Sequence, residues 1–148
     1  MMETKKKKQV FIEGPISSSF IGNSIAKHSS KTNIGAHQIF LGQVRQDHKE
    51  DALVEAIEYT CYIEMAEPIL DQIREDCFEK FDVSCLHIYH SLGKVMAGEI
   101  CLFVFTSSAH RQAATEACSY LVERIKKEVP IWGKEILNNQ ESLWKINQ

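Results

Sequence analysis

The sequence predicts an α+β protein in which helices pack against a mainly antiparallel sheet. Two amphipathic helical patterns occur in the chain, and groups of strand-like segments lie between and around them. The expected order is therefore strands, helix, two strands, helix and a short β-like tail, which is typical of helices segregated against an antiparallel sheet. With 148 residues, of which 44% are hydrophobic, the chain is long enough for one domain with a buried core.

The amino-terminal part contains only short patterns. We expect residues 1–9 to be a disordered basic tail and residues 10–148 to form a single domain. Residues 10–12 are compatible with a short strand, and residues 16–28 with a short serine-rich helix. The basic tail is not followed by the apolar segment of a signal peptide, and no apolar run approaches the roughly 20 residues that span a bilayer.

The next segments are clearer. Residues 34–45 predict a strand that runs into a turn, and the all-polar residues 46–51 predict a loop. Residues 53–62 are rich in β-branched and aromatic side chains and predict the following strand. A helix is expected over residues 64–81, because apolar residues recur at helical spacing. These residues are Met65, Ile69, Leu70, Ile73, Cys77, Phe78 and Phe81.

The second half repeats this order. Residues 83–90 alternate as in a strand, residues 91–98 predict a long connection, and residues 100–105 predict a buried strand, so the pair resembles a hairpin. The second helix is expected to be capped by Ser107 or Ser108 and to end before Pro130. Its apolar stripe comprises Ala113, Ala114, Ala117, Cys118, Leu121, Val122 and Ile125.

Composition argues against several classes of protein. The net charge of −3 argues against a general nucleic-acid binder, and no G-x-G-x-x-G or Walker A motif supports a nucleotide-binding fold. The five cysteines are widely spaced, without a C-x-x-C motif or a tight Cys/His cluster. We therefore expect no metal site, no catalytic cysteine, and buried free thiols in a reducing cytosol.

The second helix carries basic residues at both ends. His110 and Arg111 lie in the first turn, where the helix dipole disfavours cations, so a bound anion would account for them; ordinary exposed side chains are the alternative. Lys126 and Lys127 lie near the last turn, where the dipole favours cations regardless of function. Lys126 borders the apolar stripe, and a half-buried lysine there could act as a general acid or base.

The length of this helix constrains any shared site. His110 and Lys126 are sixteen residues apart, which is about 24 Å at about 1.5 Å per residue. One small ligand cannot contact both within one chain. If both line the same pocket, two chains must share it, which predicts a homodimer. Arg45 and His90 also end strand-like segments, but a solvated loop arginine and a structural histidine are the favoured interpretations.

Several motifs occur in the order and spacing of one family, although each is weak alone. They are Gly42-Gln43-Val44-Arg45, Glu58-Tyr59, Met65-Ala66, His90 with Gly93, Gly98-Glu99, Ser108-Ala109-His110-Arg111, Lys126, and Val129-Pro130-Ile131-Trp132 followed by Lys134-Glu135. Over roughly residues 10–146 the chain resembles the large, catalytic subunit of molybdopterin synthase.

The resemblance implies an α/β hammerhead fold and a cytoplasmic sulfurtransferase that needs no cofactor, nucleic acid or membrane. A homodimer would bind a small ubiquitin-like sulfur-carrier subunit at each end, giving a heterotetramer. The thiocarboxylate on the carrier's C-terminal Gly-Gly tail would give sulfur to cyclic pyranopterin monophosphate and form the dithiolene of molybdopterin. Because the partner donates the sulfur, the chain would need no reactive cysteine of its own.

The resemblance also assigns roles by position. Lys126 matches the essential lysine of the family, and Lys126 and Lys134 are the candidate catalytic residues. The candidate substrate-binding residues are Gln43, Val44, Arg45, His110, Arg111, Lys126, Gly133, Lys134 and Glu135. Of these, Arg45, His110 and Arg111 would hold the pterin phosphate, with the His-Arg pair supplied by the neighbouring chain.

Two positions depart from the family pattern. The family usually has lysine directly after Trp132, where this chain has Gly133 and then Lys134. Adjacent side chains of an extended segment face opposite ways, although glycine could let the backbone turn and re-aim Lys134. The family also commonly has arginine at the position of Ser91. Two alternatives therefore stay open: a non-catalytic scaffold of the same complex, and an unrelated phosphate-binding module.

Overall fold

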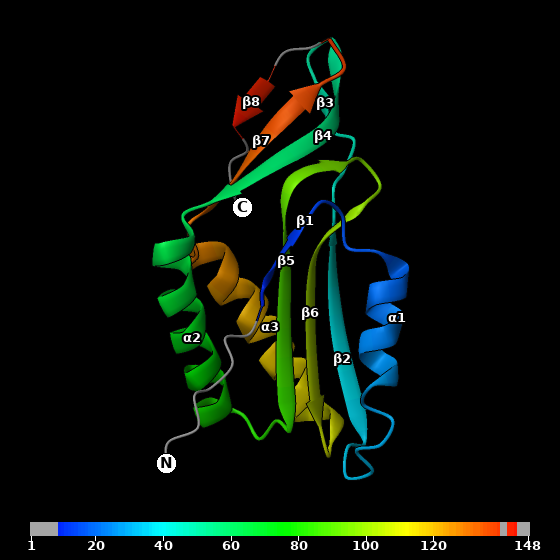
Figure 1. The fold of residues 1–148 in the computed structure, drawn as a ribbon, viewed down its shortest axis with the longest axis vertical. Helices are drawn as coiled ribbons and strands as arrows, with labels where there is room; N and C mark the ends of the chain where they lie inside the picture. The colour runs from blue at the N-terminus through cyan, green and yellow to red at the C-terminus, as the bar shows by residue number, and fades with distance from the viewer. Residues whose placement is uncertain (1–8, 140–141, 145–148) are drawn as a thin grey trace.

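A computed structural model describes residues 9–139 and 142–144 (Figure 1). The expected basic tail therefore lies, apart from residue 9, outside the described residues. The elements in chain order are β1 (Phe11–Glu13), α1 (Ser18–Ala26), β2 (Ala36–Gln43), β3 (His48–Lys49), β4 (Ala52–Cys61), α2 (Ile63–Lys80), β5 (Cys85–Met96), β6 (Ile100–Ser108), α3 (Arg111–Glu128), β7 (Ile131–Leu137) and β8 (Ser142–Trp144). No helix in this described part is long and apolar enough to cross a membrane.

The strands form one mainly antiparallel sheet. Its order is β2-β6-β5-β4-β7-β8, with β3 beside β4 and with β1 parallel to β5. The remaining pairings between neighbouring strands are antiparallel. This arrangement confirms the predicted α+β class, with helices packed against the sheet.

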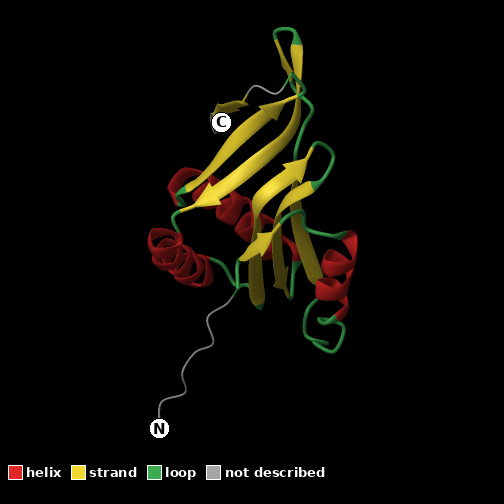
Figure 2. Ribbon diagram, turned by 45° about the horizontal axis from the view of Figure 1, so that its top comes forward, coloured by secondary structure: helices red, strands yellow, loops and turns green. Residues whose placement is uncertain are grey.

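The two faces of the sheet are covered by different helices, as Figures 1 and 2 show. Along β5, Leu86, Ile88 and His90 are buried, and the two apolar residues pack in the main core with residues of α2 and α3. The alternate residues of β5 face α1. Beneath α1, Phe103 and Phe105 form a second, smaller core. The alternation predicted for residues 83–90 is confirmed, and it separates two chemically distinct faces.

The long connection expected over residues 91–98 is wrong. β5 instead continues to Met96 and changes partner, because it pairs with β6 up to His90 and with β4 from Gly93 onward. Gly93 has a φ of 81°, which permits the change of direction. The chain then reverses tightly at Gly98, whose φ is 93° and whose N–H donates to the Val44 carbonyl (2.8 Å). The sequence of residues 91–96 does not alternate as in a typical strand, because hydrogen bonding to β4 and not the local sequence pattern determines its conformation.

Residues 46–51 and the buried stripe of α2 also differ from the predictions. The segment 46–51 is not only a loop, because β3 pairs with the start of β4 around Glu50, which adopts a left-handed φ of 55°. The buried stripe of α2 comprises Ala66, Leu70, Ile73 and Cys77, whereas Met65 and Phe78 are exposed. In α3 the predicted stripe is confirmed, except that Ala113 is only half-buried.

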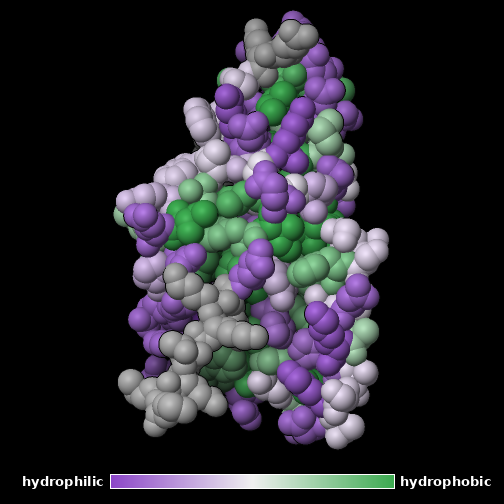
Figure 3. Space-filling model, viewed as in Figure 1, coloured by the Kyte–Doolittle hydropathy of each residue, from purple (hydrophilic) through white to green (hydrophobic). Residues whose placement is uncertain are grey.

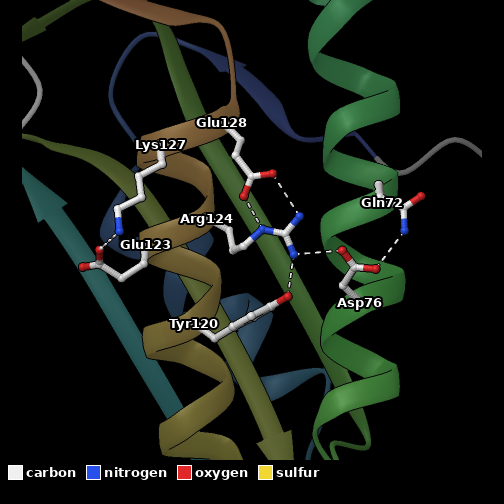
Figure 4. Close-up of polar contacts among 7 residues, drawn as sticks. All are labelled: Gln72, Asp76, Tyr120, Glu123, Arg124, Lys127 and Glu128. Carbon is white, nitrogen blue, oxygen red and sulfur yellow. Dashed lines mark hydrogen bonds and ion pairs between the residues drawn. The ribbon is translucent and has the colours of Figure 1, made fainter.

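A polar cluster joins α3 to α2 (Figure 4). The Arg124 guanidinium donates to Asp76 of α2 (2.8 Å), to Glu128 and to the Tyr120 hydroxyl. Gln72 donates to the second Asp76 oxygen (2.8 Å). The bond to Asp76 ties the last turns of α3, which carry Lys126, to α2.

Replacing Arg124 with alanine is expected to lower the melting temperature at neutral pH by about 1–4 °C, because the partners are partly exposed. The Arg124 hydrogen bonds hold the pKa of Asp76 below 3.8 and that of Glu128 below 4.5. A carboxyl with a lowered pKa in the folded state stabilises the fold above its ordinary pKa and loses this effect as the pH falls. The difference between wild type and R124A should therefore shrink below about pH 4. Thermal melts across pH test this, with K127A, which loses only the exposed pair with Glu123 (3.7 Å), as the matched control.

Candidate functional site

A pocket of about 80 Å³ lies where the end of α3 meets β7, the end of β2 and the bent strand β5. Its lining includes Gln43, Tyr59, His90, Cys101, Lys126 and Gly133. The predicted site residues Gln43, Lys126 and Gly133 are thus brought together from three separate parts of the chain. Tyr59 and Cys101 were not identified as candidate site residues from the sequence, because their places in the pocket depend on strand register.

Lys126 lies in the last turn of α3 and lines this pocket. Its side chain is exposed, so the expectation of a half-buried lysine is wrong. The neighbouring Lys127 pairs with Glu123 (3.7 Å), whereas Lys126 has no ion pair with any of the described residues. Lys126 therefore presents an ammonium group to the pocket, while Lys127 belongs to the outer face of the helix.

His90 forms the inner wall of the pocket and is 9% exposed. Its Nδ1 lies 2.8 Å from the Ser91 carbonyl, which can only accept, so Nδ1 carries the proton and Nε2 keeps a lone pair. Burial lowers the pKa of His90 to about 4, and the positive charge of Lys126 adds to this, against the opposing effect of the Ser91 bond. The ring is therefore neutral at pH 7. The interpretation as a hydrogen-bonded histidine is confirmed, but the same ring also borders the pocket.

Tyr59 and Gly133 face each other across β4 and β7. A Cβ atom at position 133 would lie 2.9 Å from Ile57 Cγ2 and 3.2 Å from Tyr59 Cε1, so the glycine leaves room for the tyrosine ring. Burial, followed by the Cys101 thiol, raises the pKa of Tyr59, which keeps its hydroxyl protonated. The Tyr59 and His90 rings meet edge to face with centroids 5.1 Å apart. Two neutral rings thus stand beside the lysine.

Lys134 lies on the other side of β7. Burial alternates along this strand, with Gly133 and Glu135 on the buried face and Trp132 and Lys134 on the opposite face. Gly133 has an ordinary strand conformation, without a positive φ, so it does not re-aim Lys134. Lys134 is absent from the lining of the pocket. Glu135 is 5% exposed and pairs with Lys49 (3.7 Å).

The three predicted binding residues at the end of β2 have side chains in different surroundings. Val44 is buried in the core, with its N–H bonded to the Glu99 carbonyl (3.0 Å). Arg45 is exposed and pairs with Asp47 (3.3 Å). Gln43 reaches the pocket of Lys126, so only the first of these three predicted binding residues lines it.

His110 and Arg111 lie at the opposite end of α3, in an open hollow of about 560 Å³ with Gln112, Thr115 and Glu116. His110 is the N-cap residue but its side chain does not cap the helix. Instead, Ser108 Oγ accepts from the Ala114 N–H (3.1 Å) and donates to the His110 carbonyl. The structure therefore places the His-Arg pair and Lys126 in different hollows at the two ends of one helix, as the sequence spacing requires.

The chemistry available around Lys126 is acid–base and electrostatic. Within the described part of the chain, the pocket lacks a close group of three metal-ligating side chains. A cation, a neutral imidazole with a free lone pair and a protonated phenol suit an anionic ligand that exchanges protons.

Residues 16–128 match the family model described as MoaE protein. The chain is similar to proteins named molybdopterin synthase catalytic subunit from Bos taurus (39% identity over 77% of this chain), Pyrococcus abyssi (36% over 76%) and Staphylococcus aureus (40% over 77%). The matched part spans 60% of the length of the bovine relative, 75% of the archaeal one and 76% of the staphylococcal one.

Two solved structures share the fold. The crystal structure of molybdopterin synthase from Staphylococcus aureus has a TM-score of 0.80 and 34% identity, covering 93% of this chain and 96% of that chain. A complex of subunits 1 and 2 of molybdopterin-converting factor from Helicobacter pylori has a TM-score of 0.78 and 22% identity, covering 94% and 90%. At this identity, the second likeness shows the fold alone.

Proposed function

Because the chain belongs to the MoaE protein family, we propose that it is the catalytic subunit of a molybdopterin synthase. It takes sulfur from the thiocarboxylated C-terminus of a small ubiquitin-like subunit and transfers it to cyclic pyranopterin monophosphate, forming the dithiolene. The observation that carries this proposal is that Lys126, at the position of the family lysine, lines a pocket with neutral His90 and Tyr59. The five cysteines are free, which suits work in a reducing cytoplasm.

Lys126 performs the main electrostatic task in this proposal. Its ammonium group attracts the anionic substrate and stabilises negative charge that develops as sulfur attacks. His90 Nε2 has a lone pair and can accept a hydrogen bond or a proton within the same pocket. Gly133 allows the Tyr59 ring to take its place in the wall of the pocket, because a side chain at position 133 would collide with Ile57 and Tyr59.

The pterin phosphate is held by Arg45, His110 and Arg111 in this proposal. The last two come from a second copy of the chain, since they lie one helix length away from Lys126 in the same copy. Exposed basic side chains at a helix start, beside free backbone N–H groups, suit a phosphate. Two copies then form two equal composite sites, and a small subunit at each end completes a heterotetramer.

Apolar side chains beside the pocket provide a surface for the small subunit. Tyr62, Ile63 and Met65 at the start of α2 are 43–51% exposed, and Trp132 of β7 is 50% exposed. The Tyr62 N–H donates to the Pro130 carbonyl (3.2 Å), which places the start of α2 directly beside the start of β7 and the pocket. Figure 3 shows apolar side chains across the middle of the face that Figure 1 presents. A carrier docked on such a patch can insert its tail toward Lys126.

The decisive experiment is single-turnover conversion of cyclic pyranopterin monophosphate by the purified chain with a thiocarboxylated small subunit. Dithiolene formation supports the enzyme. Binding of the small subunit without product would instead indicate a scaffold. Binding of phosphorylated ligands without any small subunit would indicate an unrelated phosphate-binding module.

Replacing Lys134 tests whether its side chain faces away from the pocket, as the structure of β7 indicates. Because its side chain faces away from the pocket, K134A is expected to keep its single-turnover rate within about tenfold of wild type, whereas loss of an acid–base group costs about 10²–10⁴-fold. The rate is measured with saturating small subunit. A loss within the larger range would show that β7 rearranges and that Lys134 replaces the family lysine missing at Gly133.

A further inference from the structure

The sheet face beneath α1 carries a cluster of histidine and cysteine side chains that the proposed function does not use. His28 follows α1, while Cys85 and His87 are alternate residues on β5 and therefore share a face. One nitrogen of each histidine and the Cys85 sulfur all lie within 4.8 Å of one another. This face is opposite to the one that carries His90 and the Lys126 pocket.

The hydrogen bonds of His28 fix its tautomer. Its Nδ1 lies 2.8 Å from the Ser24 carbonyl, so Nδ1 donates and Nε2 keeps the lone pair. That lone pair faces His87 Nε2 at 3.1 Å. Metal-binding histidines typically donate their other ring N–H to a carbonyl in this way, which orients the ligand nitrogen.

We propose that His28, Cys85 and His87 bind one Zn²⁺ ion. Zinc bonds of about 2.0–2.1 Å to nitrogen in a tetrahedral site place two ligand nitrogens about 3.4 Å apart, close to the separation of the two Nε2 atoms. Two imidazoles and a thiolate favour zinc over magnesium or calcium. Before binding, His87 Nε2 donates to His28 Nε2, so His87 must move its ring proton to Nδ1 for Nε2 to bind the ion. Binding forms a Zn–S bond as the Cys85 thiol releases its proton to solvent, and water fills the fourth position.

The surroundings hold the three ligands in place. The Phe105 ring is the cross-strand neighbour of His87 and lies 4.8 Å from the His28 ring and 5.9 Å from the His87 ring, centroid to centroid. His28 itself is 7% exposed. A bound ion would tie the turn after α1 to β5, beside a small core that contains Ile16, Phe103 and Phe105. The sequence predicts no metal site because 56 residues lie between His28 and Cys85, and only the fold brings the two residues together.

Cobalt(II) titration of metal-free protein, expressed without a polyhistidine tag, tests the site. We expect one Co²⁺ per chain, with a thiolate charge-transfer band and the intense visible bands of tetrahedral cobalt, and Zn²⁺ should remove both. C85S/H87A should lose these bands. The matched variant C61S/H48A also lacks one thiol and one imidazole, but outside the cluster, and should keep them. Absence of the thiolate band in wild type, or its survival in C85S/H87A, would overturn the proposal.

A second measurement needs no variant and stays valid if C85S/H87A does not fold. Trypsin cleavage after Lys80 and Lys94 gives a peptide, residues 81–94, in which Cys85 is the single cysteine. Zn²⁺ should slow alkylation of Cys85 several-fold in the folded wild-type protein and leave the rate at Cys61 unchanged. Equal alkylation of Cys85 with and without Zn²⁺ would contradict the site. Neither experiment depends on sulfur transfer, so the proposed function and the metal site can fail separately.

Discussion

Replacing Lys126 with alanine is expected to lower the single-turnover rate of dithiolene formation by roughly 10²–10⁴-fold, the range for loss of one positioned acid–base or charge-stabilising group. The fold should survive, because the side chain is exposed and has no ion pair with the described residues. Loss of one cation near a helix C-terminus costs about 0.3–1 kcal/mol. The measurements are the single-turnover rate with saturating small subunit and the melting temperature of the same preparation.

K127A is the matched control for this prediction. Lys127 is the adjacent residue in the same helical turn, but it pairs with Glu123 and does not line the pocket. K127A should therefore keep nearly the full rate with a similar small change in stability. A stable K126A protein with normal turnover would exclude the role proposed for Lys126, and equal losses in K126A and K127A would indicate a general effect of helix charge.

Mixing inactive H110A and K126A subunits is expected to restore up to about one quarter of wild-type turnover. At random equal mixing, half of the dimers contain one subunit of each kind. In such a dimer one site combines an intact Lys126 with an intact His110, while the other lacks both. We expect this recovery because His110 and Lys126 lie in separate hollows at opposite ends of α3 in one chain. A site that needs both residues must therefore combine two chains.

The control for this mixture replaces H110A with the double variant H110A/K126A. Its mixed dimers contain no site with an intact Lys126, so turnover should stay at the level of K126A alone. Subunit exchange is verified by native mass spectrometry of differently labelled chains. Full exchange without any recovery would show that Lys126 and His110 do not meet across two chains.

Local periodicity predicted much of the fold. The stripe of α3 is confirmed from Ala114 to Ile125 because two faces of contrasting polarity run along the whole helix. In α2 the same reasoning predicted that Met65 and Phe78 are buried, but both are exposed, because spacing alone does not show which apolar side chains of a wide stripe face the core. The second half of β5 was missed because its pairing with β4 joins residues more than thirty positions apart.

The candidate site was predicted less completely than the fold. The position of a basic residue on a helix, such as Lys126, can be predicted from the sequence, because it depends only on neighbouring residues of the same helix. Tyr59, His90 and Cys101 line the same pocket as Lys126, but they lie on three different strands, and strand register determines which residues are their neighbours. The alternation of β7 did indicate that Gly133 and Lys134 face apart, and the structure places Lys134 accordingly.

The pairing of Tyr59 with Gly133 makes these two positions mutationally interdependent. A side chain introduced at Gly133 alone meets Ile57 at 2.9 Å and the Tyr59 ring at 3.2 Å, so an otherwise useful basic group would arrive with a steric penalty. A smaller residue at position 59 alone would leave a void beside the glycine. Placing a lysine at position 133 therefore requires two substitutions, each of which is destabilising alone. Their effects on stability are not additive, so the two changes are best introduced together.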